Sequence, residues 1–297
     1  MTGKVPPWFA RGIEADRQQR RVKVDGAEIN YMTWGDPSKP ALMLVHGNAA
    51  HAHWWSFIAP LLSDDYYVVA HDLSGHGESE HRPAYSLDIF ARELIGVMED
   101  AGCGDLVIIG HSFGGSVSTR AATLLGDRLS GLLLAETILS PPSSVRQGRS
   151  PSVRRERIYE DYEEIRGRFR FLPPQECANT FIVDYIFEHS VRRQGHGWVW
   201  KSDGGLWAKF ERGRIDEELA DLTCPLAVFF GRDSKAAREE VLDYTHQLIG
   251  HKTSLVSLPE AEHHLFLDQP LAFVSSVRAA LGQWGYNPRM LNQSVPT

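Results

Sequence analysis

The chain has 297 residues, of which 42% are hydrophobic and 23% are charged, a composition typical of a globular protein with a sizeable core and not of a disordered or fibrous one. Its formal net charge of -7 excludes a general basic footprint for nucleic acid, although arginines gather between Arg146 and Arg170. Three widely spaced cysteines indicate neither a disulfide framework nor a zinc site, so a reducing, cytoplasmic environment is expected.

No apolar run approaches the roughly 20 residues that a membrane-spanning helix needs, and the N-terminal segment lacks the apolar stretch of a signal peptide. We therefore expect a protein that is neither exported nor inserted in a membrane. A small-molecule substrate fits this composition best. The sequence leaves the choice between a monomer and a homodimer open.

The chain opens with two predicted strands, Arg21–Val24 and Ala27–Trp34, joined at an Asp-Gly pair that favours a tight hairpin turn. Short apolar runs without alternation then recur, as is typical of strands buried on both faces of a parallel sheet. These runs are Ala41–Val45, Tyr66–Ala70, Leu106–Ile109, Leu132–Ala135, Leu226–Phe230 and Ser254–Leu258. Helical stretches are predicted between the runs, at Trp54–Leu62, Ser86–Ala101, Gly114–Leu125, Ala236–Ile249 and Leu271–Trp284. Strand and helix alternate, which predicts an α/β sandwich with a mostly parallel sheet and helices on both faces.

The alternation stops between residues 141 and 222, where the sequence turns charged and aromatic. A structureless loop of this length would be anomalous, so an inserted and mostly helical subdomain is expected. The prediction is a core formed by residues 1–140 and 223–297, with a lid at 141–222. The last residues, 289–297, are expected to form a frayed tail.

The segment Gly110–Gly115 directly follows one predicted strand and directly precedes a predicted helix. It matches the pattern G-x-S-x-G, in which a strained strand-to-helix turn pushes a serine hydroxyl above the sheet edge and small flanking residues relieve the crowding. The first turn of the helix also directs free backbone N–H groups at an anion formed there. The sequence therefore predicts Ser112 as a catalytic nucleophile.

A serine hydroxyl needs a general base at neutral pH, and histidine is the usual one. Of 13 histidines, the adjacent pair His263 and His264 comes just after the last predicted strand, which fits the chain order serine, acid, histidine. The residues alone leave both open. Four other histidines are scattered over two loops without the spacing of a metal site, and we expect no metal and no cofactor: His51, His53, His71 and His76.

Three motifs stand in the order found in α/β-hydrolases: Val45–Asn48 after the third predicted strand, His71–Ser79 after the fourth, and the Ser112 turn after the fifth. The chain resembles this superfamily over nearly its whole length, and the placing of Asn48, Trp55 and Pro60 is similar to that in haloalkane dehalogenases and epoxide hydrolases. The resemblance implies the α/β-hydrolase fold, with an eight-stranded sheet and a helical cap inserted after the sixth strand. Those enzymes attack with an aspartate at this position. A serine alkoxide attacks acyl carbon instead, so dehalogenase and epoxide-hydrolase activity are not expected.

The same resemblance bears on the base and the acid. In the family the catalytic histidine commonly lies seven residues before a proline that opens the last helix; here Pro270 selects His263 and leaves His264 as a packing neighbour. Most members carry the acid three residues after a glycine that ends the seventh strand, but that place holds Ser234, and Asp233 lies one position early. Some dehalogenases use a glutamate at the end of the sixth strand, which resembles Glu136. We predict Glu136 as the acid, with Asp233 as the alternative.

The tetrahedral intermediate of acyl transfer carries a negative charge on oxygen, which needs preorganised donors. The residue after the nucleophile and the loop after the third strand each supply a backbone N–H in this type of site, and these map to Phe113 and Asn48. His46, beside Asn48, is expected to order the loop.

Several tryptophans in loops or in the predicted lid are candidates for the walls of an apolar substrate pocket. For any single one of them, packing inside the lid's own core is the more common role. The predicted pocket residues are Trp54, Trp55, Trp198, Trp200 and Trp207. The leading hypothesis is a serine hydrolase that cleaves a carboxylic ester or lactone of a small, largely apolar molecule. The alternatives are hydrolysis of a C–C bond with the same triad and a hydrolase-like ligand receptor with slow turnover.

Overall fold

The structure is a computed structural model, and it describes residues 5–137, 139, 141, 157–211, 213–250 and 253–286. The predicted tail at 289–297 and most of the basic stretch before residue 157 lie outside the described residues. In the described part of the chain, no helix is both long and apolar enough to cross a membrane.

A single large sheet organises the molecule. Within the described residues it has eight strands in the order β1-β2-β4-β3-β6-β7-β11-β12, and after the antiparallel opening all neighbours from β4 to β12 run parallel. The strands are β1 (Gln18–Val24), β2 (Ala27–Trp34), β3 (Ala41–Val45), β4 (Tyr67–His71), β6 (Leu106–His111), β7 (Leu129–Ala135), β11 (Leu226–Gly231) and β12 (Ser254–Leu258). The predicted mostly parallel sheet is confirmed.

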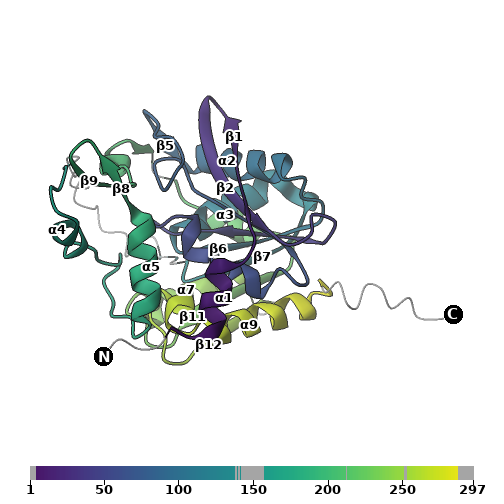
Figure 1. Cartoon of the computed structure of the whole chain (residues 1–297). Helices are drawn as coiled ribbons and strands as arrows, with labels where there is room; N and C mark the ends of the chain where they lie inside the picture. The colour runs from purple at the N-terminus through teal and green to yellow at the C-terminus, as the bar shows by residue number, and fades with distance from the viewer. Residues whose placement is uncertain are drawn as a thin grey trace.

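Both faces of the sheet are covered by helices, which explains why its strands are apolar without alternation. Alternate residues of one strand enter different cores: Leu42 and Leu44 of β3 belong to one hydrophobic cluster, and Met43 and Val45 belong to the other. The first cluster packs under α1 (Pro7–Glu14), α8 (Leu265–Asp268) and α9 (Pro270–Gln283). The second packs under α2 (Leu87–Asp100), α3 (Phe113–Leu125) and α7 (Glu239–Ile249), and Figure 1 shows α2 and α9 on opposite sides of the sheet.

Two short elements differ from the prediction. The predicted helix at Trp54–Leu62 is wrong: the segment forms two 3₁₀ turns, η1 (Ala52–Trp55) and η2 (Ala59–Leu61). Pro60 explains the break, because it has no N–H to donate and its ring clashes with the preceding helical turn. Helix α1 was not predicted at all; it buries Phe9, whose ring contacts those of Phe57 and Phe181.

Between β7 and β11, the described residues add no strand to the large sheet. We call residues 157–211 and 213–221 the insert. It contains α4 (Tyr162–Arg166), α5 (Thr180–Ser190), β8 (Val191–Gln194), β9 (Gly197–Trp200), η5 (Leu206–Ala208), β10 (Phe210–Glu211) and α6 (Asp216–Asp221). Strands β8 and β9 form an antiparallel hairpin that the sequence reading missed, and β10 pairs with β5 (Tyr85–Ser86).

The insert stands beside the sheet and contacts the helices that cover it. Figure 1 shows α4, β8 and β9 grouped on one side, with α5 running from them toward α1. The rings of Phe181 and Tyr185 on α5 contact Phe9 of α1. Helix α6 packs instead against α3 and α7, so the end of the insert lies within the helical layer of the sheet.

Candidate active site

Ser112 lies in the sharp turn between β6 and α3, with a backbone φ of 53° in the left-handed region that non-glycine residues rarely adopt. The glycines around it allow this turn to fit. A Cβ at Gly114 would lie 2.4 Å from the His46 carbonyl oxygen, and one at Gly115 would lie 1.8 Å from Thr137 Oγ1. Glycine is therefore required at positions 114 and 115, because the neighbouring loops lie too close to the backbone there to leave room for a Cβ.

A chain of hydrogen bonds joins the serine to a carboxylate. Ser112 Oγ lies 2.9 Å from His263 Nε2, and His263 Nδ1 lies 3.0 Å from Glu136 Oε2. Because a carboxylate can only accept, Nδ1 carries the proton and Nε2 is free to accept one from the serine. Glu136 is 0% exposed and His263 is 5% exposed, so this chain is shielded from bulk water.

Glu136 follows the last residue of β7 and adopts a φ of 52°, a second left-handed residue at the same sheet edge. Its carboxylate accepts two further hydrogen bonds, one from the Gly231 backbone N–H at 2.7 Å and one from Ser234 Oγ at 2.8 Å. Ser234 occupies the place where the resembled family usually carries the acid. It donates to the glutamate that lies against His263.

Asp233 lies elsewhere. Its backbone N–H donates to the Ala261 carbonyl, and the residue is exposed at the surface. Of the two predicted acids, the structure thus brings Glu136 to His263 and leaves Asp233 facing solvent.

The loop after β3 contacts the serine turn. A Cβ at Gly47 would lie 3.2 Å from Ser112 Cβ and 2.9 Å from His111 Nδ1. The backbone N–H groups of Asn48 and Phe113 donate no hydrogen bond to any described residue; Phe113 directly follows Ser112, and Asn48 directly follows Gly47. Asn48 Oδ1 accepts a hydrogen bond from Trp207 Nε1 at 3.1 Å, so its side chain ties the loop to the insert.

His46 orders this loop, as its hydrogen bonds show. The Leu73 backbone N–H donates to its Nε2 at 3.0 Å, which leaves the proton on Nδ1, and Nδ1 donates to the Gly47 carbonyl at 2.7 Å. Burial, together with the neighbouring His76, holds the pKa of His46 well below its ordinary value. A neutral imidazole that is fully engaged in this way is a structural element of the loop.

The predicted pocket tryptophans separate into three groups. The Trp207 ring lies 5.2 Å from Phe113, and Trp54 lies 5.3 Å from His264, so these two flank the serine turn and the histidine loop. Trp55 is 0% exposed and stacks on Phe266 in the core beneath, which makes it a core residue rather than a pocket wall. Trp198 packs on Tyr162 within the insert, and Trp200 lines a cavity described below.

One group of three potential metal-ligating residues lies close together in the described part of the chain: His111, His263 and His264, with ligand atoms within 4.8 Å of one another. Both nitrogens of His263 already contact Ser112 and Glu136, and His111 Nε2 donates to the His263 carbonyl at 3.0 Å. A metal here would have to replace these contacts. The group is better explained as the packing that holds the His263 loop in place.

Comparison with known sequences identifies relatives of this chain. The sequence profile of the alpha/beta hydrolase family matches residues 42–276. The chain is 27% identical to a serine hydrolase-like protein of Danio rerio over 86% of each chain, and 23% identical to an esterase of Mycobacterium tuberculosis over 87% of this chain and 88% of that one. It is also 31% identical to epoxide hydrolase A of the same bacterium, over 43% of this chain and 41% of the relative.

A thioesterase domain from the curacin biosynthetic pathway has a similar fold, with a TM-score of 0.75 at 24% identity over 89% of this chain and 99% of that domain. The profile match spans most of the chain and includes Ser112, Glu136 and His263. The chain belongs to the alpha/beta hydrolase family, and it is a hydrolase.

Proposed function

We propose that this hydrolase cleaves a carboxylic ester or lactone of a small molecule through an acyl-enzyme on Ser112. One observation carries the proposal: the continuous path from Ser112 Oγ through His263 to the buried Glu136 carboxylate, with contacts of 2.9 and 3.0 Å. This arrangement suits a nucleophile, its general base and the group that orients the base.

In the first half of the reaction, Ser112 Oγ attacks the acyl carbon while His263 Nε2 takes the serine proton. The carbonyl oxygen gains the negative charge, and the unused N–H groups of Asn48 and Phe113 are the donors that would stabilise it. The intermediate collapses when His263 passes the proton to the leaving alcohol oxygen. Glu136 accepts the Nδ1–H throughout and stabilises the imidazolium by its charge.

In the second half, a water molecule replaces the alcohol. His263 takes a proton from this water as its oxygen attacks the acyl carbon, and the carboxylic acid leaves as Ser112 recovers its proton. A serine forms an acyl ester that water can hydrolyse in this way. For this reason we prefer acyl chemistry to epoxide hydrolysis, although a protein named epoxide hydrolase A matches part of the chain.

The surroundings favour an apolar group next to the scissile bond. Trp207 and Phe210 pack around Phe113 on one side, and Trp54 and Phe171 lie against the His264 ring on the other. We further propose that residues 141–222 act as a cap over the serine, since Trp207 of the insert reaches Asn48. Aromatic side chains of this kind bury large apolar areas with few polar demands.

The nucleophile is tested with a fluorophosphonate probe and a p-nitrophenyl ester. Ser112→Ala should abolish labelling and lower kcat by at least about 10⁴-fold, because the covalent step has no other nucleophile. The matched control is Ser254→Ala. Ser254 begins β12, whereas Ser112 follows the end of β6, so the two serines lie at opposite ends of the parallel strands, and the control should keep labelling and turnover. Labelling retained in Ser112→Ala, at an unchanged melting temperature, would refute the assignment.

The kinetics distinguish the esterase from two other uses of the same residues. An esterase turns over p-nitrophenyl esters many times, whereas a receptor with a slow hydrolase-like site gives one stoichiometric burst and then stops. A C–C hydrolase would release products from a β-diketone faster than from an ester of the same size. A panel of esters and lactones graded by acyl size completes the test.

A further inference from the structure

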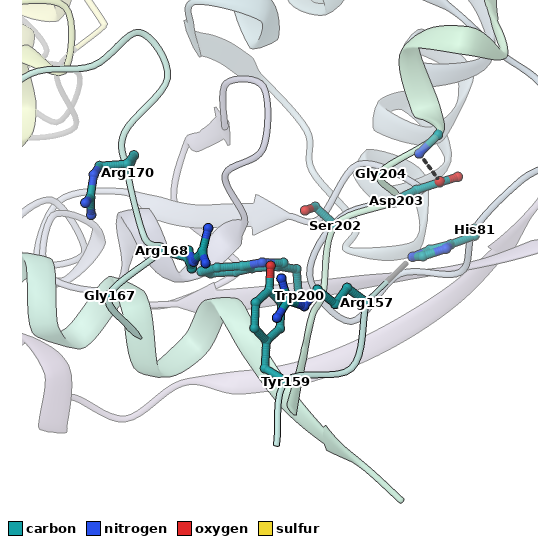
Figure 2. A pocket seen from close by; sticks show the side chains of 11 residues that line it. His81, Arg157, Tyr159, Gly167, Arg168, Arg170, Trp200, Ser202, Asp203 and Gly204 are labelled. Atoms are coloured by element: carbon teal, nitrogen blue, oxygen red, sulfur yellow. Dashed lines mark hydrogen bonds between the residues drawn. The ribbon is translucent and has the colours of Figure 1, made fainter. Parts of the chain in front are cut away.

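The insert holds a second feature with a clear chemical character, a cavity of about 630 Å³ lined by Arg157, Arg168, Arg170, Trp200 and Asp203 among others. Figure 2 shows the arginine side chains along this cavity, with Trp200 and Tyr159 near its centre and Asp203 beside His81. Three arginines around one cavity are unexpected in a chain with a formal net charge of -7.

The charges in the cavity are not balanced within the described residues. Arg157 pairs with Glu164 at 2.8 Å, and the Asp203 carboxylate is held by Lys209 Nζ and Tyr85 Oη, each at 2.8 Å. The Arg170 guanidinium donates only to the neighbouring Phe169 carbonyl, and the Arg168 guanidinium has no hydrogen bond or ion pair with any described residue. Two guanidinium groups therefore face the cavity without a carboxylate partner in the part of the chain that the structure describes.

A smaller cavity of about 100 Å³ adjoins the first one, because the two have lining residues in common. The two share Arg168, Arg170 and Trp200, and the smaller one is also lined by Ala49 and Ala50. Ala49 directly follows Asn48, and consecutive Cα atoms are only about 3.8 Å apart. The smaller cavity is therefore lined both by Arg168 and Arg170 and by the loop after β3, whose Gly47 lies against Ser112.

We propose that Arg168 and Arg170 bind an anionic group, a carboxylate or a phosphate, at the far end of the substrate whose ester bond meets Ser112. This rests on the proposed ester hydrolysis and refines its substrate class from a largely apolar molecule to one with a charged end. Guanidinium groups match the planar, bidentate geometry of carboxylate and phosphate oxygens. The Trp200 ring, which lines both cavities, offers an apolar surface for the chain between the two ends.

The test compares two matched series of substrates. One consists of mono-p-nitrophenyl esters of dicarboxylic acids with six, eight and ten carbons; the other consists of p-nitrophenyl esters of monocarboxylic acids of the same lengths. Wild-type enzyme should prefer the charged series at one chain length by at least tenfold in kcat/KM. The double variant Arg168→Gln/Arg170→Gln should lose this preference and keep its kcat/KM for the neutral series within twofold.

A matched control is Arg128→Gln, an exposed arginine that pairs with Glu99 and lines neither cavity; this change should affect neither series. An equal loss on both series, or an unchanged preference in the double variant, overturns the proposal. If wild type hydrolyses neither series and Ser112 is not labelled, the proposed ester hydrolysis fails instead, and the two failures remain distinguishable.

Binding is measured separately with Ser112→Ala protein, so that turnover plays no part. Calorimetric titration with the eight-carbon dicarboxylate and with inorganic phosphate distinguishes the two anion sources by which one binds more tightly. In the double arginine variant the affinity for the preferred anion should fall at least tenfold. Failure of both anions to bind at millimolar concentration would contradict the proposal.

Discussion

Glu136 and Asp233 are the two candidates for the acid, and their different surroundings lead us to expect opposite effects of substitution on kcat. Glu136→Gln places an amide against His263 Nδ1, which favours the wrong tautomer of the imidazole, so kcat should fall by about 10³- to 10⁴-fold. Asp233→Asn changes an exposed side chain and should leave kcat within twofold. Steady-state kinetics with one p-nitrophenyl ester measures both.

Melting temperatures of the two variants serve as the control, because Glu136 is also a buried acceptor for Gly231 and Ser234. A large loss of kcat in Asp233→Asn alone would show that the acid changes place in solution. A loss in neither variant would show that His263 needs no carboxylate.

Ser234 makes a more demanding prediction possible. Its Oγ lies 2.8 Å from Glu136 Oε2, the same oxygen that accepts the His263 Nδ1–H. A carboxylate introduced by Ser234→Asp would therefore lie near His263 if the glutamate were removed. The background for this test is Glu136→Gly, since glycine also tolerates the positive φ at this position. In that background, Ser234→Asp should raise kcat by about 10- to 100-fold, which is less than the full effect of the native acid.

The control for this transfer is Ser234→Ala in the same Glu136→Gly background, which adds no carboxylate and should restore nothing. If aspartate and alanine give equal rates, the oxygen at position 234 does not reach the histidine.

At the residue level, Ser112 and its turn could be predicted from the sequence because all the residues of this motif are close together in the chain. The turn around Ser112 needs glycine at defined places, and its strand and helix are adjacent in the chain. The contact between Glu136 and His263 joins residues 127 positions apart, and only a family resemblance suggested it. The basic stretch between Arg146 and Arg170 was visible in the sequence, yet nothing there indicated that Arg168 and Arg170 face a cavity.

The turn between β6 and α3 is the element on which the site depends, and its glycines can be tested for stability. Gly115→Ala would place a Cβ 1.8 Å from Thr137 Oγ1, so the neighbouring loop must shift, at a cost of about 1–3 kcal/mol in the free energy of unfolding. The matched control is Gly282→Ala in α9, where a Cβ would meet nothing within 4 Å apart from the adjacent backbone of the helix itself, and alanine should stabilise the helix by up to about 1 kcal/mol.

Urea denaturation midpoints measure both changes. The expected outcome is a shift in opposite directions. Equal shifts would mean that the turn relaxes freely, and the argument from close packing would then be wrong. Thr137→Gly combined with Gly115→Ala should recover part of the loss, since it removes the clashing hydroxyl.

The elements that sequence analysis missed share a physical reason. Helix α1 has only 8 residues and depends on the burial of Phe9 against Phe57 and Phe181, which are distant in the chain. Three of the four residues of β8 are exposed, so the strand carries no buried-strand pattern, and its hairpin depends on the turn at Gly195 with a φ of 59°. By contrast, the central strands are buried on both faces, and their apolar runs identify them directly.

Over the whole molecule, buried histidines link stability to pH. Six histidines in the described part of the chain are at most 3% exposed, and burial is the largest cause that lowers the pKa of each: His46, His51, His71, His76, His111 and His264. Above the ordinary pKa of 6.5 they are neutral in both states, so they do not affect stability. As the pH falls below 6.5, the unfolded chain binds protons that the folded chain cannot, and stability is lost.

The size of this effect is about 1.4 kcal/mol for each such histidine at pH 5.5. Domains of this kind have total stabilities of about 5–15 kcal/mol. Urea midpoints should therefore fall steeply between pH 7.5 and pH 5.5. Burial raises the pKa values of Asp72 and Glu93 from ordinary values of 3.8 and 4.5, so above those values these two carboxyl groups act in the opposite direction: the folded chain gains stability as the pH falls.

His71 allows a single histidine to be isolated. It is 0% exposed at the end of β4, burial lowers its pKa to about 3, and neither ring nitrogen has a hydrogen-bond partner among the described residues. His71→Leu places an apolar side chain of similar size in the core and removes one titrating group. The loss of unfolding free energy between pH 7.5 and pH 5.5 should shrink by about 1.4 kcal/mol relative to wild type. If both proteins lose stability in parallel, His71 is protonated in the folded state, and the interior at the end of β4 must then contain a partner for the charge.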